Sequence, residues 1–217
     1  MSDSDDETTL SSHAHQALLE FLAEKKEREE KLEIIKNSQE QESVVDIELE
    51  ENWQLSQFWY DEKTTKTLGE EALRLAGESG SIACISCPTI YRHLRKNKPQ
   101  SCNVKLLEFD TRFAMYGEDF LFYDYRSPLE LPRDMQSGFN VVIADPPFLS
   151  EECLTKTAVT IKFLAKGAVI LCTGAIMEDL AKRLLHLNLC NFLPHHSNNL
   201  ANDFRCFSNY NLDEFIQ

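Results

Sequence analysis

Short apolar segments alternate with amphipathic segments along residues 81–187, and this alternation restricts the fold more than any other feature. The expected strands are SIACIS, VKLLEF, FLFY, FNVVIA and AVILC, at residues 81–86, 104–109, 120–123, 139–144 and 168–172. Helices are expected between them at residues 89–96, 150–165 and 174–187. Several of the strands are apolar at odd and even positions alike, which is typical of strands buried on both faces of a parallel sheet. The pattern predicts an α/β fold with a doubly wound sheet.

Both ends of this alternating region depart from the pattern. Residues 190–194 and 204–210 read as two more strands without a helix between them, which predicts a terminal antiparallel hairpin on the sheet edge. Before the first strand, residues 61–80 place apolar side chains on one helical face, with acids near the start and glycines at the end. The aromatic stretch ENWQLSQFWY, residues 51–60, reads most simply as a short buried helix.

The first 50 residues form an acidic arm that we expect to be helical in part and disordered in part. They hold 15 acids and 5 bases, a net charge of −10, whereas the remaining 167 residues contribute −4. Residues 14–22 carry an apolar helical stripe, and the periodicity is lost before residue 50. The arm is either a docking element for a partner or a solubilising segment. The predicted domains are therefore the arm, residues 1–50, and one folded domain, residues 51–217.

The chain lacks the sequence features of a secreted or membrane protein. No apolar run approaches the roughly 20 residues that span a bilayer, and the N-terminal stretch MSDSDDETTL is acidic where a signal peptide is basic. We expect a cytosolic or nuclear protein, the cytoplasm being favoured, with its seven cysteines reduced. The pair Cys84 and Cys87 forms a single CxxC without the second pair that a zinc site needs, so no metal site is predicted.

Acidic residues follow three successive expected strands. Asp110, Asp124 and Asp145 stand at the ends of the second, third and fourth strands, where open α/β sheets bind their ligands. Carboxylates accept hydrogen bonds from hydroxyls and amines but repel phosphates. The first strand also lacks the G-x-G-x-x-G loop of pyrophosphate cofactors. S-adenosylmethionine meets these conditions, because it has a ribose diol, an exocyclic amine, a cationic sulfonium and no phosphate.

The fourth strand runs into Asp145-Pro146-Pro147-Phe148, which matches the (D/N/S)PP(Y/F/W) motif of class I methyltransferases that modify nitrogens. Together with the stretches EENWQLSQFWY, EFDTRFAMYGEDFLFYDY, IADPPFLSEECL, ILCTGAIME and NLANDFRCF, it makes the chain after the arm similar to the eukaryotic elongation factor 1-alpha lysine methyltransferase family. That family has also been labelled N6-adenine-specific DNA methyltransferases. The resemblance implies a seven-stranded Rossmann-like sheet, S-adenosylmethionine as methyl donor and a lysine of elongation factor 1-alpha as acceptor.

The resemblance also implies roles for individual cofactor-binding residues. Asp110 is expected to accept from the ribose hydroxyls, Asp124 to read the adenine amine and Ser86 to approach the methionine part of the cofactor. Gln57 and Phe58 are expected to complete the pocket. The stretch CISCPT replaces the usual glycine loop after the first strand, which is a departure from the methyltransferase pattern.

The DPPF residues are expected to act on the acceptor. Asp145 and the carbonyl of Pro146 accept N–H bonds and aim the nitrogen lone pair, because the rings of Pro146 and Pro147 fix the backbone. Phe148 walls the acceptor channel, by stacking on a base or packing beside a lysine.

Two other functions remain open at this level. An N6-adenine methyltransferase of DNA or RNA would use the same motif, but it must grip phosphates, and this chain is acidic even without its arm. An inactive methyltransferase-fold scaffold is the other alternative, against which the intact DPPF motif argues. We therefore expect a monomeric enzyme that acts on elongation factor 1-alpha, with no membrane or nucleic-acid partner.

Overall fold

The computed structural model describes residues 49, 51–52, 55, 57–198 and 203–216. These residues belong to one compact unit of the chain, Glu48–Gln217. The expected acidic arm, apart from residue 49, lies outside the described residues. No described helix is long and apolar enough to cross a membrane.

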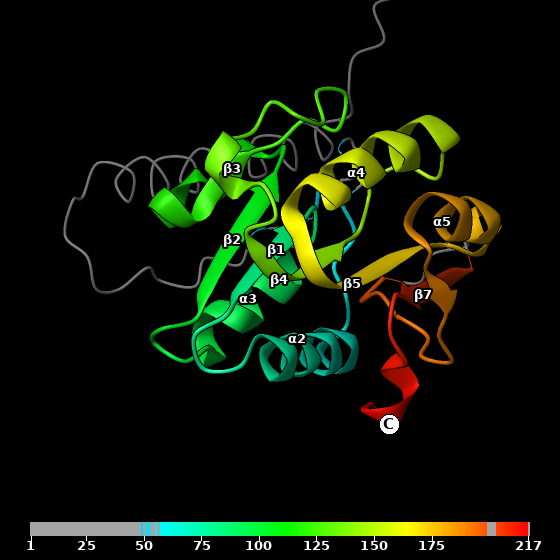
Figure 1. Ribbon diagram of the computed structural model, residues 1–217, viewed down its shortest axis with the longest axis horizontal. Helices are drawn as coiled ribbons and strands as arrows, with labels where there is room; N and C mark the ends of the chain where they lie inside the picture. The colour runs from blue at the N-terminus through cyan, green and yellow to red at the C-terminus, as the bar shows by residue number, and fades with distance from the viewer. Residues whose placement is uncertain (1–48, 50, 53–54, 56, 199–202, 217) are drawn as a thin grey trace, which may run out of the picture. The chain divides into compact units, whose positions relative to one another are not determined.

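Seven strands form a single mixed sheet in the order β3-β2-β1-β4-β5-β7-β6 (Figure 1). The strands are β1 (Ser81–Ile85), β2 (Asn103–Glu108), β3 (Phe120–Phe122), β4 (Phe139–Ala144), β5 (Ala165–Gly174), β6 (Asn188–Leu189) and β7 (Phe204–Ser208). The first five are parallel, whereas β7 pairs antiparallel with β5 and with β6. The α/β class, the seven strands and the terminal antiparallel hairpin are therefore confirmed.

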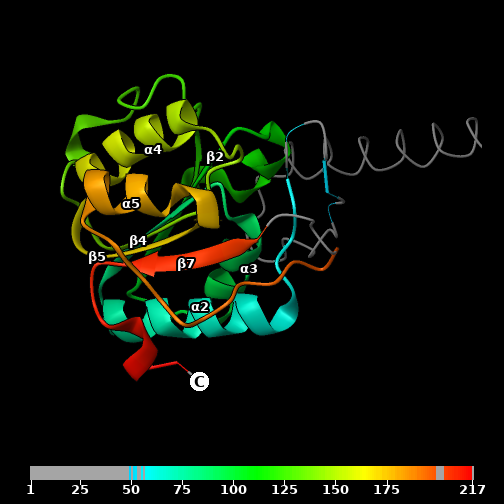
Figure 2. The ribbon, with the colours of Figure 1, turned by 90° about the vertical axis from the view of Figure 1, so that its right-hand side faces the viewer.

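Helices cover both faces of this sheet. The α-helices are α2 (Glu62–Ala76), α3 (Pro88–Asn97), α4 (Glu151–Leu164) and α5 (Glu178–Leu185). In Figures 1 and 2, α2 and α3 lie together on one face, and α4 and α5 lie on the other. The central strands β1 and β4 are consequently buried along nearly their whole length, which explains why they are apolar at consecutive positions.

Local chemistry sets the helix starts that border the sheet edge. The Asp61 carboxylate accepts from the N–H of Thr64 and begins α2, and the Ser150 hydroxyl accepts from the N–H of Cys153 and begins α4. Pro88 occupies the first turn of α3, where its missing N–H costs nothing. The helices α3 and α4 therefore start shortly after the carboxyl ends of β1 and β4. The helix α2 starts directly after the segment at residues 57–60.

Three sequence expectations about elements need correction. Described residues 57–60 are not helical; they form an extended segment, because Tyr60 pairs with His196 in an antiparallel bridge. The helix expected at 174–187 is shorter, since β5 extends to Gly174 and a 3-10 turn, Ala175–Met177, precedes α5. The strand expected at 190–194 lies earlier, at Asn188–Leu189, where pairing with β7 places it.

Candidate active site

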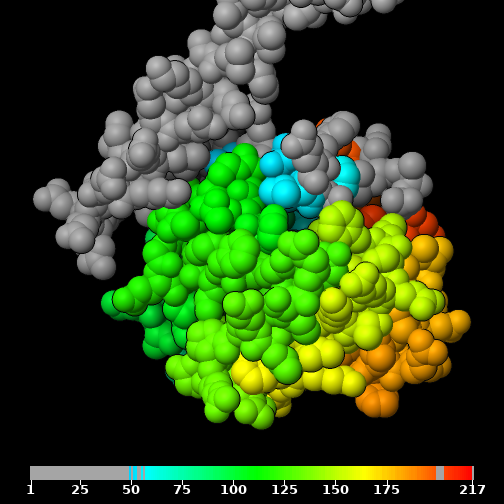
Figure 3. Space-filling view, turned by 90° about the horizontal axis from the view of Figure 1, so that it is seen from above, coloured from blue at the N-terminus to red at the C-terminus, as the bar shows by residue number. Residues whose placement is uncertain are grey.

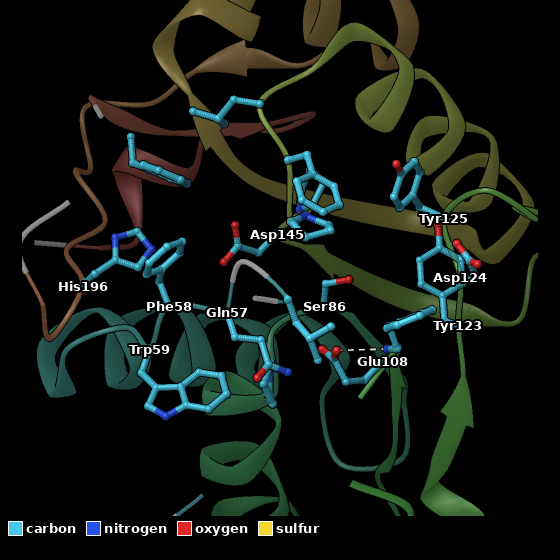
Figure 4. Close-up of a pocket in the computed structure, with 18 of the residues that line it drawn as sticks. Gln57, Phe58, Trp59, Ser86, Glu108, Tyr123, Asp124, Tyr125, Asp145 and His196 are labelled. Carbon is cyan, nitrogen blue, oxygen red and sulfur yellow. Dashed lines mark hydrogen bonds between the residues drawn. The ribbon is translucent and has the colours of Figure 1, made fainter. Parts of the chain in front are cut away.

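The carboxyl ends of the parallel strands surround one cavity of about 620 Å³. Its lining residues are Leu55, Gln57, Phe58, Trp59, Ser86, Pro88, Glu108, Phe109, Tyr123, Asp124, Tyr125, Arg126, Asp145, Pro146, Pro147, Phe148, Leu149, His196 and Phe204. Figure 3 shows part of the surface around it, where the cyan segment before α2 lies beside the green region that follows β2. The cavity thus combines seven separate stretches of the chain, and Figure 4 shows their side chains converging on it.

The DPPF motif forms the link between β4 and α4. The N–H of Asp145 donates to the carbonyl of Ile85 at 3.0 Å, which continues the pairing of β4 with β1 by one residue. The link packs closely against β5, because a Cβ at Gly174 would lie 3.0 Å from both δ-carbons of Leu149. All four motif residues line the cavity. The structure therefore brings the sequence-predicted Asp145, Pro146, Pro147 and Phe148 to one site.

Asp145 is a partly buried carboxyl with an altered proton affinity. Burial in the cavity wall is the main cause that raises its pKa to about 7; the Tyr60 hydroxyl opposes this rise, and the nearby Glu108 carboxylate adds to it. In Figure 4 the carboxyl points toward the side of the cavity that Phe58 and His196 form. Asp145 can therefore accept or release a proton near neutral pH.

Glu108, the last residue of β2, is a second acid in this cavity, and the sequence reasoning missed it. Its Oε1 accepts from the backbone N–H of Phe109 at 2.9 Å and of Asp110 at 3.1 Å. Burial raises the pKa of this carboxyl to about 7, although the two backbone hydrogen bonds lower it. The signal for Glu108 is its position at the end of a buried strand, in the same EFD stretch that contains Asp110.

Asp110 does not line the cavity. It is buried and forms an ion pair with Arg112 at 2.6 Å. It also accepts from the side-chain amide of Gln57 at 3.1 Å, and the Gln57 carbonyl oxygen accepts from Arg112 at 3.1 Å. The structure thus places Asp110 behind the cavity wall, where its network holds Gln57, which does line the cavity.

Asp124, Ser86 and Phe58, three of the residues expected to bind the cofactor, also line the cavity. Asp124 forms an ion pair with Arg126 at 2.6 Å, and hydrogen bonding from this guanidinium lowers the pKa of the carboxyl. Ser86 adopts a left-handed backbone with φ of 56° at the turn after β1. The backbone geometry that glycine usually provides is therefore present without a glycine.

His196 and Phe204 come from the C-terminal region and were not singled out from the sequence. The His196 ring is 4.7 Å from the ring of Phe204 and 6.5 Å from that of Phe58, in edge-to-face arrangements. Burial lowers the pKa of His196 to about 4, so the imidazole is neutral at physiological pH. These rings make one wall of the cavity aromatic and uncharged.

The composition of the cavity fits S-adenosylmethionine. Its volume lies within the range of about 300–1,000 Å³ that is usual for small-molecule sites. Glu108 and Asp124 supply acceptors for ribose hydroxyls and an adenine amine, and aromatic rings supply apolar surface. Among the described lining residues the only Lys or Arg is Arg126, which is already paired with Asp124, so the site offers little to a phosphate.

Solved structures of methyltransferases and related enzymes share this fold. The chain resembles the branched-chain polyamine synthase C9 mutein of Thermus thermophilus, solved with N4-aminopropylspermidine and 5'-methylthioadenosine, with a TM-score of 0.54 and 13% identity over 74% of this chain and 59% of that one. It also resembles the precorrin-6y C5,15-methyltransferase of Geobacter metallireducens, with a TM-score of 0.50 and 13% identity over 79% of this chain and 100% of that one. The fold and the DPPF site together define a class I methyltransferase.

Sequence relatives narrow this class. The family described as probable N6-adenine methyltransferase matches residues 51–212. EEF1A lysine methyltransferase 1 of Homo sapiens is 49% identical over 213 residues, which cover 97% of this chain and 96% of the human protein. Protein-lysine N-methyltransferase M142.8 of Caenorhabditis elegans is 43% identical over 221 residues and covers 97% of both chains. The chain belongs to the EEF1A lysine methyltransferase family.

Proposed function

We propose that this protein transfers a methyl group from S-adenosylmethionine to a lysine side chain of elongation factor 1-alpha. The observation that carries the proposal is the placement of the DPPF link, with Asp145 at a cavity suited to the cofactor, in a chain about half identical to relatives named for this reaction. An active enzyme, and not a scaffold, is supported because every motif residue faces the cavity.

The residues that would hold the cofactor follow from the cavity wall. Glu108 would accept from the ribose hydroxyls, in the role first expected of Asp110, and Asp124 would accept from the adenine amine. Ser86 would contact the methionine part, while Gln57 and Phe58 close the pocket on the side of the segment before α2. When bound, S-adenosylmethionine supplies an electrophilic methyl group on a sulfonium.

Asp145 and Pro146 would prepare the acceptor nitrogen. A free lysine has a pKa near 10.4, so its ammonium must lose a proton before the nitrogen can attack. The Asp145 carboxylate and the Pro146 carbonyl would accept the remaining N–H bonds and direct the lone pair toward the methyl carbon. Such alignment lowers a barrier by about 7 kcal/mol or more in well-oriented intramolecular reactions.

Phe148 would form the outer wall of the acceptor channel. Its ring is half-exposed and packs edge-to-face on Tyr125 at 5.8 Å. An aromatic face there favours the methylene stem and the cationic head of a lysine. Pro147 keeps Phe148 in place, because its ring fixes φ between Pro146 and the aromatic residue.

A methyl-transfer assay tests the proposal. We expect labelled S-adenosylmethionine to methylate purified elongation factor 1-alpha, and Asp145→Ala to reduce kcat by roughly 100-fold or more, because alanine offers no acceptor for the N–H bonds of the amine. Asp134→Ala is the matched control, since Asp134 is exposed and precedes β4, at the end of the strand away from the cavity. If calorimetry detected no cofactor binding to the wild-type protein, the proposal would fail.

The acceptor is tested separately from the chemistry. The family description names an adenine methyltransferase, so DNA and RNA oligonucleotides belong in the same assay. Label on the oligonucleotides and none on the elongation factor would replace lysine by adenine as the acceptor. We further propose that the protein works as a monomer in the cytoplasm, where elongation occurs; sedimentation and cell fractionation test these two points.

A further inference from the structure

The Tyr60 side chain carries a polar group that the proposed mechanism does not yet use. Tyr60 is only 4% exposed, and its hydroxyl has no hydrogen-bond partner among the described residues. A buried hydroxyl without a partner is costly, and native proteins rarely keep one without a use. The hydroxyl therefore needs an explanation beyond packing.

Backbone pairing fixes the position of Tyr60. The N–H of Asp61 donates to the carbonyl of His195 at 2.9 Å, and the N–H of Ser197 donates to the carbonyl of Trp59 at 2.8 Å. These bonds form the antiparallel bridge that sets Tyr60 opposite His196. Asp61 also caps α2, so the segment is anchored on both sides.

Stacking on a neighbouring ring fixes the orientation of the Tyr60 phenol. It stacks on the His196 imidazole with a centroid distance of 4.8 Å and an interplanar angle of 28°. His196 is held in turn against Phe204. Burial lowers the pKa of His196 to about 4, so the imidazole is a neutral packing surface at physiological pH. The ionisable group of interest beside Tyr60 is therefore the Asp145 carboxyl.

The Tyr60 hydroxyl and the Asp145 carboxyl are close enough for each to shift the pKa of the other, although no hydrogen bond joins them in this structure. After burial, the charge of Asp145 is the strongest influence that raises the pKa of Tyr60, so the phenol stays protonated and remains a donor. The other titratable groups near the pair are Glu108, which acts on Asp145, and the buried thiols Cys87 and Cys172, which act on Tyr60. Glu108 and burial favour the protonated form of Asp145, and the tyrosine hydroxyl alone favours the ionised form.

We propose that Tyr60 is a positioning residue for Asp145, whose carboxyl it holds in the ionised, accepting form by donating its hydroxyl while His196 fixes the ring. This inference rests on the proposed function, because it assumes that Asp145 accepts an N–H bond from the acceptor amine. A protonated Asp145 presents a donor on one oxygen and aims the amine poorly. The hydroxyl thus widens the pH range in which the site works.

Tyr60→Phe removes the hydroxyl and keeps the ring and its stack on His196. NMR titration of the cofactor-free protein labelled with carboxyl-¹³C aspartate reports the pKa of Asp145 directly, with the resonance assigned by its loss in Asp145→Asn. We expect Tyr60→Phe to raise this pKa by about one unit, since the charged form loses the hydroxyl that we propose donates to it. The control Tyr91→Phe alters another buried tyrosine, in α3 and outside the cavity, and should leave the titration unchanged.

Kinetics supply a second test. In Tyr60→Phe the acidic limb of the kcat/KM profile should move to higher pH by the same amount, with near wild-type activity regained at alkaline pH and cofactor affinity unaltered. Adding Tyr60→Phe to Asp145→Asn should cost nothing further, because the hydroxyl acts through the carboxyl. An unchanged Asp145 titration, or additive losses in the double variant, would overturn the inference. An inactive wild-type enzyme would contradict the proposed function and leave the NMR test valid.

Discussion

At the scale of single residues, the acid at the end of β2 shows what the sequence can and cannot predict. The stretch EFD offers Glu108 and Asp110, which are two residues apart and so would share one face of an extended chain. A strand expected to end at residue 109 favours Asp110. In the structure β2 ends at Glu108, which pairs with Phe122 of β3. That pairing is a long-range contact, and local pattern does not reveal it.

The assignment of Glu108 leads to a binding prediction. Glu108→Gln should weaken S-adenosylmethionine binding about tenfold or more, because the ribose hydroxyls lose a charged acceptor. The raised pKa of about 7 adds a pH signature: wild-type affinity should fall between pH 8 and pH 6 as Glu108 is protonated, and the variant should not show this fall. Calorimetry at several pH values measures both effects.

The Asp110→Asn variant tests whether Asp110 contacts the cofactor or only supports the cavity wall. Because Asp110 is held by Arg112 and Gln57 behind the wall, its change should lower the Tm more than it lowers cofactor affinity at temperatures where the variant is folded. A tenfold loss of affinity with an unchanged Tm would return the ribose contact to Asp110.

At the scale of elements, the turn between β1 and α3 combines a predictable feature with an unpredictable one. The helix expected at residues 89–96 is present, and Pro88 occupies its first turn. The left-handed backbone of Ser86 has no such mark, since serine at positive φ is uncommon and its cost is offset by the surrounding fold. The donation from Ser86 N–H to the Leu107 carbonyl at 2.9 Å is one contact that holds it.

Substitutions at Ser86 should follow backbone geometry. Ser86→Val should destabilise the protein by about 1–3 kcal/mol, because a β-branched residue resists positive φ. Ser86→Gly should change stability by less than about 1 kcal/mol, since relief of strain is opposed by the greater freedom of glycine when unfolded. Denaturant unfolding of both variants tests the comparison, and an equal loss in the two would show that the side chain, and not φ, matters at this turn.

The extended segment before α2 illustrates the other limit of local pattern. Its described aromatic residues, Phe58, Trp59 and Tyr60, are at least partly buried, but residues 57–60 are not helical as expected, because residues 59–61 pair with residues 195–197 from the far end of the chain. This pairing brings His196 to the cavity. Such a partner, more than 130 residues away, leaves no periodicity in the local sequence.

At the scale of the whole molecule, alternation of strands and helices was sufficient to predict the sheet and the edge at which the cavity lies. That success has a physical basis, since the ends of parallel strands meet at one edge whatever the details of pairing. The aromatic wall was not predictable, because it depends on the antiparallel return of β7 against β5. The site is therefore a property of the complete unit, Glu48–Gln217.

A truncation tests whether this unit suffices. A chain that begins at Glu48 should bind S-adenosylmethionine with wild-type affinity and keep its Tm within about 2 °C, because every cavity-lining residue lies beyond that point. A chain that begins at Asp61 is the control and should lose both, since it lacks Gln57, Phe58 and Tyr60. Methyl transfer to elongation factor 1-alpha by the chain that begins at Glu48 then shows whether residues 1–47 are needed for action on the acceptor protein. A tenfold loss of cofactor affinity in that truncation would contradict the expectation.

Two of the three acids that line the cavity, Glu108 and Asp145, should also govern how stability depends on pH. Glu108 and Asp145 both have pKa values raised to about 7 in the folded protein, from ordinary values of 4.5 and 3.8. A raised carboxyl pKa contributes stability that is present below the unfolded value and is lost as pH rises through the folded value. The cofactor-free protein should therefore lose several °C of Tm from these groups between about pH 4 and pH 8.

In the double variant Glu108→Gln, Asp145→Asn this loss of Tm should shrink, because the amides carry no charge to desolvate. Thermal unfolding across that pH range measures the slope, with the exposed pair Asp134→Asn, Asp179→Asn as the control that should keep it. Equal slopes in the two double variants would mean that the buried carboxyls ionise without cost, and that the pH sensitivity of the fold lies outside the active site.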